Sequence, residues 1–260
     1  MEKAIGAVKP KISLPDPDFT EEGGGQNLCG NHLSTAPSLL NIYVQTFEQA
    51  QKLRLETNNR MRCWLRDTTP KEEWSDNKFN DTAIADAEEL PNDLRHFIQS
   101  IEQMEKDAKK MMRREMKKHK LWPWLESIRG IDTTLAARLM HRLGDIKNKF
   151  PSPAHLWSYA GLDGPGWRQR PHSWGLTSIC YNIADSFQKQ PALSGGYRDI
   201  YDARKEYEAT KPPCEKCKEQ GFEEKCRPGH INNKARRYTV KEFLKDLWVY
   251  ANEIDGPKKG

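Results

Sequence analysis

The chain has 260 residues, 30% of them charged, and a mean hydropathy of −0.89. This length allows one large or two small domains with a hydrophobic core. No apolar run approaches the ~20 residues of a membrane span and the N-terminus carries no signal-peptide core, so we expect a soluble, cytoplasmic protein without membrane contact. The net charge of +5, from 42 Lys and Arg against 37 Asp and Glu, is too small to identify a partner.

The first 120 residues are predicted to form an arm and two helices. Residues 1–36 combine proline, glycine and charge without periodicity, which is typical of a flexible arm. Apolar residues between Ser38 and Arg66 follow the helical period, and a second helix is predicted from about Thr82 to Lys120, with a start or kink near Pro91. Its apolar residues are spaced by three and four, as in a heptad stripe: Leu94, Phe97, Ile101, Met104, Ala108 and Met111.

Two long helices joined by a polar loop predict a helical hairpin over residues 37–120. The heptad stripe fits two arrangements equally well. It either forms a core stripe inside one chain or makes a coiled coil through which residues 38–118 assemble a homo-oligomer.

The second helix ends in a strongly basic run, residues 106–120, with eight Lys and Arg against Asp107 and Glu115. Charge runs on helices are commonly solvated faces. This run, however, directly precedes a glycine turn at residues 128–132, so Lys117 and Lys118 are candidates for one phosphate-binding surface shared with that turn.

The segment Ile128-Arg129-Gly130-Ile131-Asp132 predicts a tight turn before a helix at residues 135–143, which Thr133 or Thr134 can cap. A glycine turn that enters a helix N-terminus leaves backbone N–H groups pointing outward and forms an anion site. On a basic protein, nucleic-acid phosphate is the expected anion. The candidate contact residues are Arg129, Gly130, Ile131, Thr133, Thr134 and Arg138.

Glycine, proline, tryptophan and arginine dominate the loop that follows a short helix begun by Ser152 and Pro153. Arg168 and Arg170, near Trp167 and Trp174, are candidates for holding a nucleic-acid strand by charge and stacking. The alternative is an ordered connector whose tryptophans are tucked into the core.

Residues 214–230, CEKCKEQGFEEKCRPGH, have the spacing Cys-x2-Cys-x8-Cys-x3-His. This spacing predicts a structural zinc in a loop at residues 212–231, because four protein ligands fill a tetrahedral site. The alternative is a reduced, cysteine-rich loop that happens to contain a histidine. The chain's other cysteines are scattered, so no disulfide framework is expected. The predicted ligands are Cys214, Cys217, Cys226 and His230.

The final helix begins with the cations Lys234, Arg236 and Arg237. Cations near a helix N-terminus oppose the helix dipole, so local stability does not account for them. A phosphate partner would, and the three residues are therefore candidate nucleic-acid contacts.

The sequences GIDTTLAARLMHRLGDI and FPSPAHLWSYAGL resemble the C-terminal, helix-hairpin-helix domain of insertion-sequence one-ten, one-sixteen and nine-oh-two type transposases, the Piv-like DNA recombinases. The resemblance covers residues 125–190. It implies that residues 121–256 form an all-α domain that handles DNA in transposition or site-specific recombination.

Full-length members of that family carry an N-terminal RuvC-like domain that binds divalent metal, whereas this sequence has two predicted helices in that place. Magnesium is therefore expected only with a RuvC-like partner. The family also uses a serine beyond the YAGL segment as nucleophile, for which Ser173 is the candidate and Ser178 the other nearby serine. The turn has Asp132 where the family typically has glycine, and this carboxylate can cap a helix but would repel a close phosphate.

Three functions remain open at this stage. The first is a transposase-related, nucleoid-associated DNA-binding protein that acts as a truncated or accessory recombinase. The second is an active serine-type recombinase, with Ser173 as nucleophile and Arg168 and Arg170 stabilising the phosphate transition state. The third is a structural scaffold. Whether the chain is an enzyme, and whether its nucleic acid is DNA or RNA, is left open by these residues.

Overall fold

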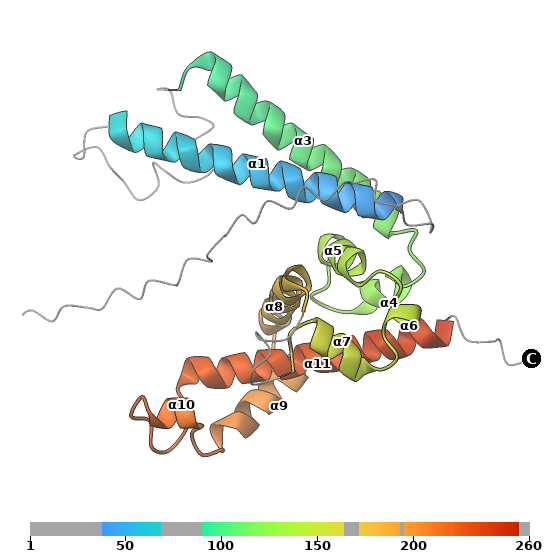
Figure 1. Ribbon diagram of the computed structural model, residues 1–260, viewed down its shortest axis with the longest axis vertical. Coiled ribbons are helices and arrows are strands. Elements are labelled where there is room, and N and C mark those ends of the chain that lie inside the picture. Colours follow the sequence, from blue (N-terminus) through green and yellow to red (C-terminus); the bar gives the residue numbers. More distant parts are fainter. Residues whose placement is uncertain (1–37, 69–89, 164–171, 193–194, 255–260) are drawn as a thin grey trace, which may run out of the picture. The chain divides into compact units, whose positions relative to one another are not determined.

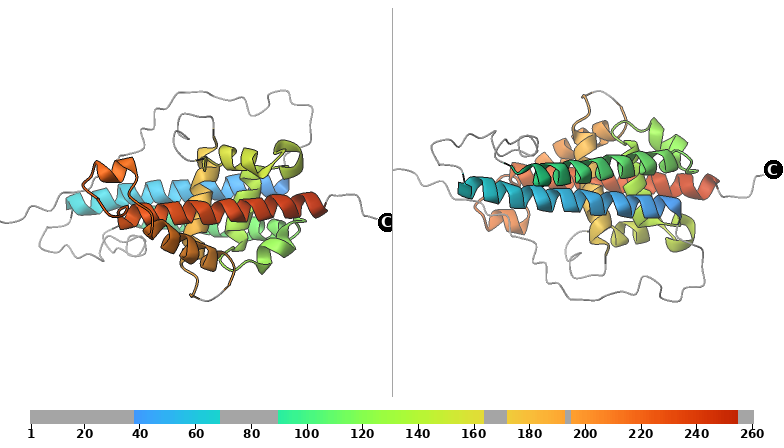
Figure 2. Two further views of the ribbon diagram at one scale, coloured as in Figure 1. Left: turned by 90° about the horizontal axis from the view of Figure 1, so that it is seen from below. Right: turned by 90° about the horizontal axis from the view of Figure 1, so that it is seen from above.

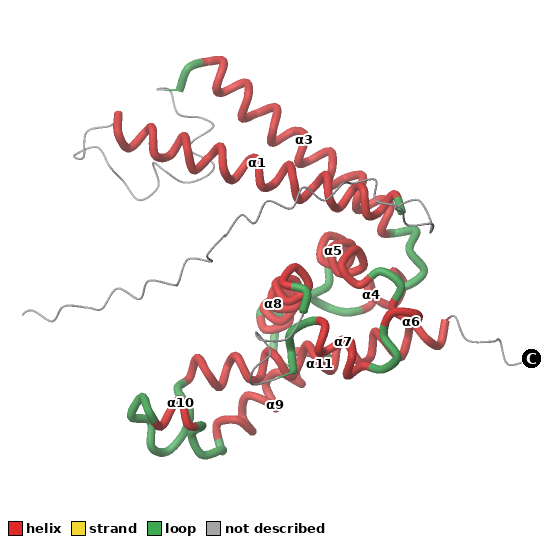
Figure 3. Tube along the Cα trace, in the orientation of Figure 1, coloured by secondary structure: helices red, strands yellow, loops and turns green. Residues whose placement is uncertain are grey.

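The computed structural model describes residues 38–68, 90–163, 172–192 and 195–254 (Figure 1). Within these ranges every regular element is a helix and no strand occurs (Figure 3), which confirms the all-α prediction. The predicted arm at residues 1–36 and the loop arginines Arg168 and Arg170 lie outside the described residues. None of the described helices combines the length and apolar character that a membrane span requires.

Helices α1 (Leu39–Thr68) and α3 (Asn92–Met116) lie side by side (Figure 2). Pro91 precedes the first residue of α3, as its fixed φ predicts. The two helices run antiparallel: the start of α1 shares a buried cluster with the end of α3, while Leu65 near the end of α1 packs with Ile98 near the start of α3. Helices, rather than strands, therefore occupy the described residues that precede residue 121.

The buried stripe of α3 differs from the predicted one. Ile98 and Met112 are buried against α1, whereas Phe97 is 51% and Met104 is 45% exposed. The predicted and the observed stripes are adjacent on the helix and share Ile101 and Ala108, so the three-and-four spacing does not distinguish them.

A polar contact between α1 and α3 occurs on the side of α3 that is buried. Arg54 of α1 donates from Nε to Glu105 Oε2 at 2.5 Å, and Gln51 Nε2 lies 3.4 Å from Glu105 Oε1. These part-buried groups satisfy one another only when Glu105 faces α1, which turns Phe97 and Met104 outward.

The remaining helices follow local signals in the sequence. Ser152 with Pro153 begins α7, as predicted, and Gly144 ends α5 with a φ of +65°. Pro123 lies in the first turn of α4, where its missing N–H is not needed. The helices are α4 (Trp122–Ser127), α5 (Thr133–Leu143), α6 (Ile146–Lys149), α7 (Pro153–Tyr159), α8 (Trp174–Gln188), α9 (Tyr197–Ala209), α10 (Glu215–Lys218) and α11 (Pro228–Ile254).

The core is organised around α11, which packs against α6, α7, α8 and α9. Phe243 of α11 is fully buried, with its ring centroid 5.5 Å from those of Phe187 and Tyr197 and 5.9 Å from that of Trp124. Helix α5 packs against α1, α3 and α8, so one apolar cluster extends from α1 to α11. The domain boundary near residue 120 stays a prediction.

Candidate metal centre and nucleic-acid interface

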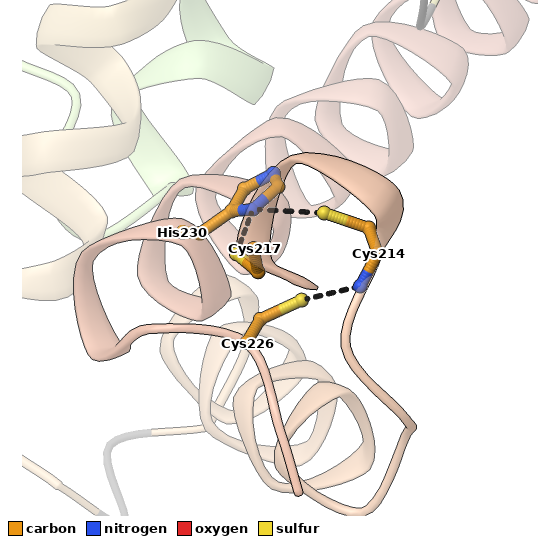
Figure 4. A group of neighbouring side chains, drawn as sticks. All are labelled: Cys214, Cys217, Cys226 and His230. Atoms are coloured by element: carbon orange, nitrogen blue, oxygen red, sulfur yellow. Dashed lines mark hydrogen bonds between the residues drawn. The ribbon is translucent and has the colours of Figure 1, made fainter. Parts of the chain in front are cut away.

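Three segments supply the cysteines and the histidine of the predicted metal site. Cys214 immediately precedes α10, Cys217 lies within it, Cys226 belongs to the following loop and His230 lies in the first turn of α11. The N–H groups of Cys217 and Lys218 donate to the Cys214 carbonyl at 2.9 and 3.0 Å, which closes the turn between the first two cysteines. The three sulfur atoms and the imidazole face a common centre (Figure 4).

The four ligand atoms lie within 4.8 Å of one another. His230 Nδ1 is 3.4 Å from Cys214 Sγ and 3.2 Å from Cys217 Sγ. A zinc ion with bonds of about 2.0–2.3 Å would give ligand separations of roughly 3.3–3.8 Å, close to these values. The arrangement can therefore hold a metal ion such as zinc. Because all four positions come from protein, it has the form of a structural site rather than a catalytic one.

Hydrogen bonds and charge favour a thiolate at Cys226. Burial raises the pKa of this thiol, but the Cys214 N–H at 3.3 Å and Lys234 Nζ at 3.6 Å act in the opposite direction, and the net result is a lowered pKa. Burial raises the pKa of Cys217. The pKa of His230 is lowered by burial and by the cations Lys234, Arg227, Arg237 and Lys216, so the imidazole is held in its neutral, ligating form.

The predicted phosphate contacts Lys234, Arg236 and Arg237 do not begin the final helix, because α11 starts at Pro228 and places them in its second and third turns. They are largely engaged by neighbouring helices. Lys234 pairs with Glu208 of α9 at 3.3 Å. Arg236 donates to the Tyr181 carbonyl of α8 at 3.2 Å and pairs with Asp185 at 3.4 Å. Arg237 is half-buried, without an ion-pair partner among the described residues. The acidic partners come from distant sequence positions, so the local pattern of cations gave no sign of them.

The turn before α5 rests on α8. Gly130 has a φ of +95°, its carbonyl accepts the Ser186 hydroxyl at 2.5 Å, and an added Cβ would lie 3.1–3.2 Å from Phe187, Ser186 and Gln190. The Ile131 N–H donates to the Ile128 carbonyl at 3.1 Å. Only glycine fits this combination of conformation and space.

Asp132, rather than Thr133 or Thr134, caps α5. Its Oδ1 accepts the Leu135 N–H at 2.7 Å, and both threonines are helical residues, so the helix begins two residues earlier than predicted. Arg113 of α3 reaches the same point, with Nη2 3.5 Å from Asp132 Oδ2 and Nε 3.2 Å from Thr134 Oγ1. The basic end of α3 therefore lies next to the turn.

The other candidate cations have different surroundings. Lys117 and Lys118 are exposed at the end of α3, where Lys118 pairs with Glu115 at 2.8 Å. Arg129 is exposed and lines a surface pocket of about 260 Å³, together with Gly195 and Gly196 before α9. Arg138 points instead to α1, where its Nε pairs with Glu48 at 3.0 Å.

Ser173, the candidate nucleophile, caps α8. Its Oγ accepts the Leu176 N–H at 3.3 Å and its own N–H donates to the Tyr159 carbonyl at 2.9 Å. The neighbouring Trp174 is 62% exposed, with its ring centroid 4.4 Å from that of His172. This tryptophan is therefore not tucked into the core, as the alternative for this loop required.

Residues 123–165 match the model of the Transposase IS116/IS110/IS902 family. The match supports a domain of the C-terminal type found in such transposases, and confirms the sequence resemblance over the segment from α4 to the end of the YAGL motif. No curated protein and no solved structure matches the chain.

Proposed function

With the transposase-type segment at residues 123–165 as the premise, we propose that the chain is a DNA-binding protein of transposition or site-specific recombination. Helix α4, the turn at residues 128–132 and α5 would act as a helix-hairpin-helix that grips phosphates, and the basic end of α3 would extend the same surface. In this role the protein is a truncated or accessory recombinase that acts on the nucleoid in the cytoplasm.

The observation that carries this proposal is the contact of Arg113 with Asp132 and Thr134. It joins two features that are separate in the sequence: the basic run of α3 and the glycine turn. The same contact reduces the repulsion that the Asp132 carboxylate would exert on a phosphate, because the Arg113 guanidinium offsets part of its negative charge. Arg113 and Asp132 are both about half exposed, so solvent weakens the pair and leaves both open to a ligand.

We expect Arg129→Glu to weaken binding of duplex DNA by about tenfold or more, since a phosphate contact is lost and a repulsive charge is gained. The decrease of affinity with salt should also become shallower, because fewer counterions are released. Lys52→Glu is the matched control: it makes the same charge change on an exposed side chain of α1. Fluorescence anisotropy at two salt concentrations measures both quantities.

Asp132→Asn provides a second arm of this test. Asparagine keeps the cap of α5 but removes the charge, so we expect severalfold tighter DNA binding and little change in stability. Unchanged DNA affinity in both Arg129→Glu and Asp132→Asn would remove the turn from the proposed interface.

We further propose that the ion held by the Cys3His group is a structural zinc, supported by the soft donor set and the filled coordination positions.

A second copy of the chain is the proposed partner of α3. Phe97, Met104 and Met111 recur every seven residues beside the seam with α1, and the first two are about half exposed. A second apolar stripe, here called the apolar lane of α3, beside the stripe that is buried against α1 is typical of a helix that packs against two neighbouring helices.

The Oγ of Ser173 accepts the Leu176 N–H as the cap of α8, so our proposal assigns Ser173 a structural role and no role as nucleophile.

A further inference from the structure

Two half-exposed tyrosines flank one arginine between α9 and α11. The Arg204 guanidinium carbon lies 4.9 Å from the ring centroid of Tyr207 on α9 and 4.4 Å from that of Tyr238 on α11. Lys211 Nζ lies 4.1 Å from the Tyr207 centroid. Tyr207 is 50% and Tyr238 is 37% exposed. Cations at these distances attract the ring faces and hold the two rings in place while leaving them accessible to solvent.

Arg204 is in turn held by a buried carboxylate. Glu208, with a side chain that is only 4% exposed, accepts from Arg204 Nη2 at 2.5 Å and pairs with Lys234 at 3.3 Å. Lys234 Nζ also lies 3.6 Å from Cys226 Sγ. A continuous set of polar contacts therefore leads from the metal ligand Cys226 through Lys234, Glu208 and Arg204 to the two tyrosine rings.

The surroundings of the rings are basic. Between Arg204 and Lys241 the chain has eleven Lys and Arg against six Asp and Glu, an excess equal to the net charge of the whole chain. Several of these cations are exposed on α9 or on the loop at residues 212–231 that carries the Cys3His group, here called the metal loop. None of the following has an acidic partner among the described residues: Lys205, Lys216, Lys218, Lys225 and Arg227.

We propose that this surface of α9, α10 and α11 binds single-stranded nucleic acid, with unpaired bases stacking on Tyr207 and Tyr238 and the surrounding cations following the phosphates. Glu208 is a positioning residue: it fixes Arg204, and through Arg204 it fixes the two rings. The metal loop would thus support a preformed stacking surface on α9 and α11, through the contacts that lead from Cys226 to the two tyrosine rings.

The chemistry of the surface separates a single strand from a duplex. A ring that stacks on a base needs an exposed base face, which an intact duplex presents only at its ends. Aromatic rings interleaved with cations are the arrangement by which proteins hold unpaired strands with little sequence preference. This surface is distinct from the turn at residues 128–132, so it can be tested without that turn.

The test uses the full, metal-loaded chain with fluorescent oligo-dU and oligo-U, which share one base and differ in the sugar, and a duplex of the same length. We expect the double variant Tyr207→Ala/Tyr238→Ala to lose about fivefold or more in affinity for the single strand while its duplex affinity stays unchanged. The variant Tyr207→Phe/Tyr238→Phe keeps the ring faces and should bind as the native chain does. Val249→Ala, at an exposed position further along α11, is the matched control. Whichever oligonucleotide binds more tightly identifies the sugar that the surface prefers.

Glu208→Gln separates positioning from net charge. The substitution removes one negative charge from the surface, so electrostatic attraction of the phosphates alone predicts tighter binding of the strand. Because it loosens Arg204, our proposal predicts weaker binding of the single strand, and the metal content checks that the loop is intact. Tighter binding by Glu208→Gln would overturn the positioning role. Unchanged affinity in the alanine variant, loss in the phenylalanine variant, or an equal loss for the duplex would overturn the proposed stacking surface.

Discussion

Gly130 shows how one residue couples the turn before α5 to the core. An alanine there must adopt a positive φ, at a cost of about 1–2 kcal/mol, and its Cβ must also displace Phe187 or Ser186. Gly144 has a positive φ as well but open space around it. We expect Gly130→Ala to lower the free energy of unfolding by about 2–3 kcal/mol and Gly144→Ala by about 1–2 kcal/mol. Urea unfolding measures both, and equal losses would show that crowding by α8 contributes nothing.

Two partly buried histidines predict a dependence of stability on pH. The pKa of His119 is lowered by burial and by Lys120, and that of His141 by burial and by Arg142, with Glu48 opposing. The unfolded chain therefore binds more protons than the folded chain below about pH 6.5. The contribution of these groups is fully present above that pH and is lost as pH falls through their folded pKa values.

We expect the free energy of unfolding to decrease between pH 7.5 and 5.5, and the decrease to be smaller in His119→Gln and His141→Gln. His96→Gln, at an exposed position of α3, is the control. A wild-type stability that is flat or rises as the pH falls over this range would contradict the assignment.

For single residues, the sequence predicted which side chains group together at the metal site better than it predicted the partners of individual cations. The grouping of three cysteines and one histidine that could hold a metal ion was predictable, since their spacing is typical of ligands to one ion. The roles of Lys234 and Arg236 were not, because Glu208 and Asp185 reach them from other helices. The sequence offered Thr133, Thr134 and Asp132 as caps of α5, and the carboxylate of Asp132 is the group that reaches the Leu135 N–H.

At the scale of elements, the metal loop has little core of its own: Cys217, Cys226 and Ile231 form its small buried cluster. We expect the purified chain to contain about one zinc ion, and Cys226→Ser to lose it, with a lower melting temperature. Cys63→Ser, at an exposed cysteine of α1 outside the site, should keep both metal and stability. Metal analysis with thermal melting, before and after chelation, measures this.

A chain that contains no zinc while its cysteines are reduced would contradict the zinc proposal. So would a melting temperature that is unaffected by the Cys226 substitution.

The apolar period and the caps predicted the existence of each described long helix. They did not always predict which face of the helix is buried. Along α3 two adjacent stripes have the same spacing, and the Arg54–Glu105 contact with another helix accompanies the observed face. Periodicity describes one helix at a time, whereas the choice of face depends on the neighbour.

For the whole molecule, the half-exposed apolar lane of α3 predicts self-association. We expect the native chain to be a dimer or larger, and Phe97→Glu/Met104→Glu to be monomeric, because two charges would be buried at the interface. Leu55→Glu, with a similar exposure on α1, is the control for surface charge. Size-exclusion chromatography with light scattering measures the mass. A native monomer, or a double variant that keeps the native mass, would contradict this assembly.

The packing of α11 has a spectroscopic consequence. The Trp157 indole N–H donates to the Lys241 carbonyl at 2.9 Å, and the Trp248 indole N–H donates to the Phe150 carbonyl at 2.8 Å. The two bonds join α11 to residues that lie 84 and 98 positions away in the chain. The two indole protons should therefore give well-dispersed nuclear magnetic resonance signals that exchange with deuterium slowly, and only when α11 separates from α7 or from the Phe150 segment. Their exchange rates, followed with and without the metal or a nucleic-acid strand, would report from the edge of the core on events at either end of this helix.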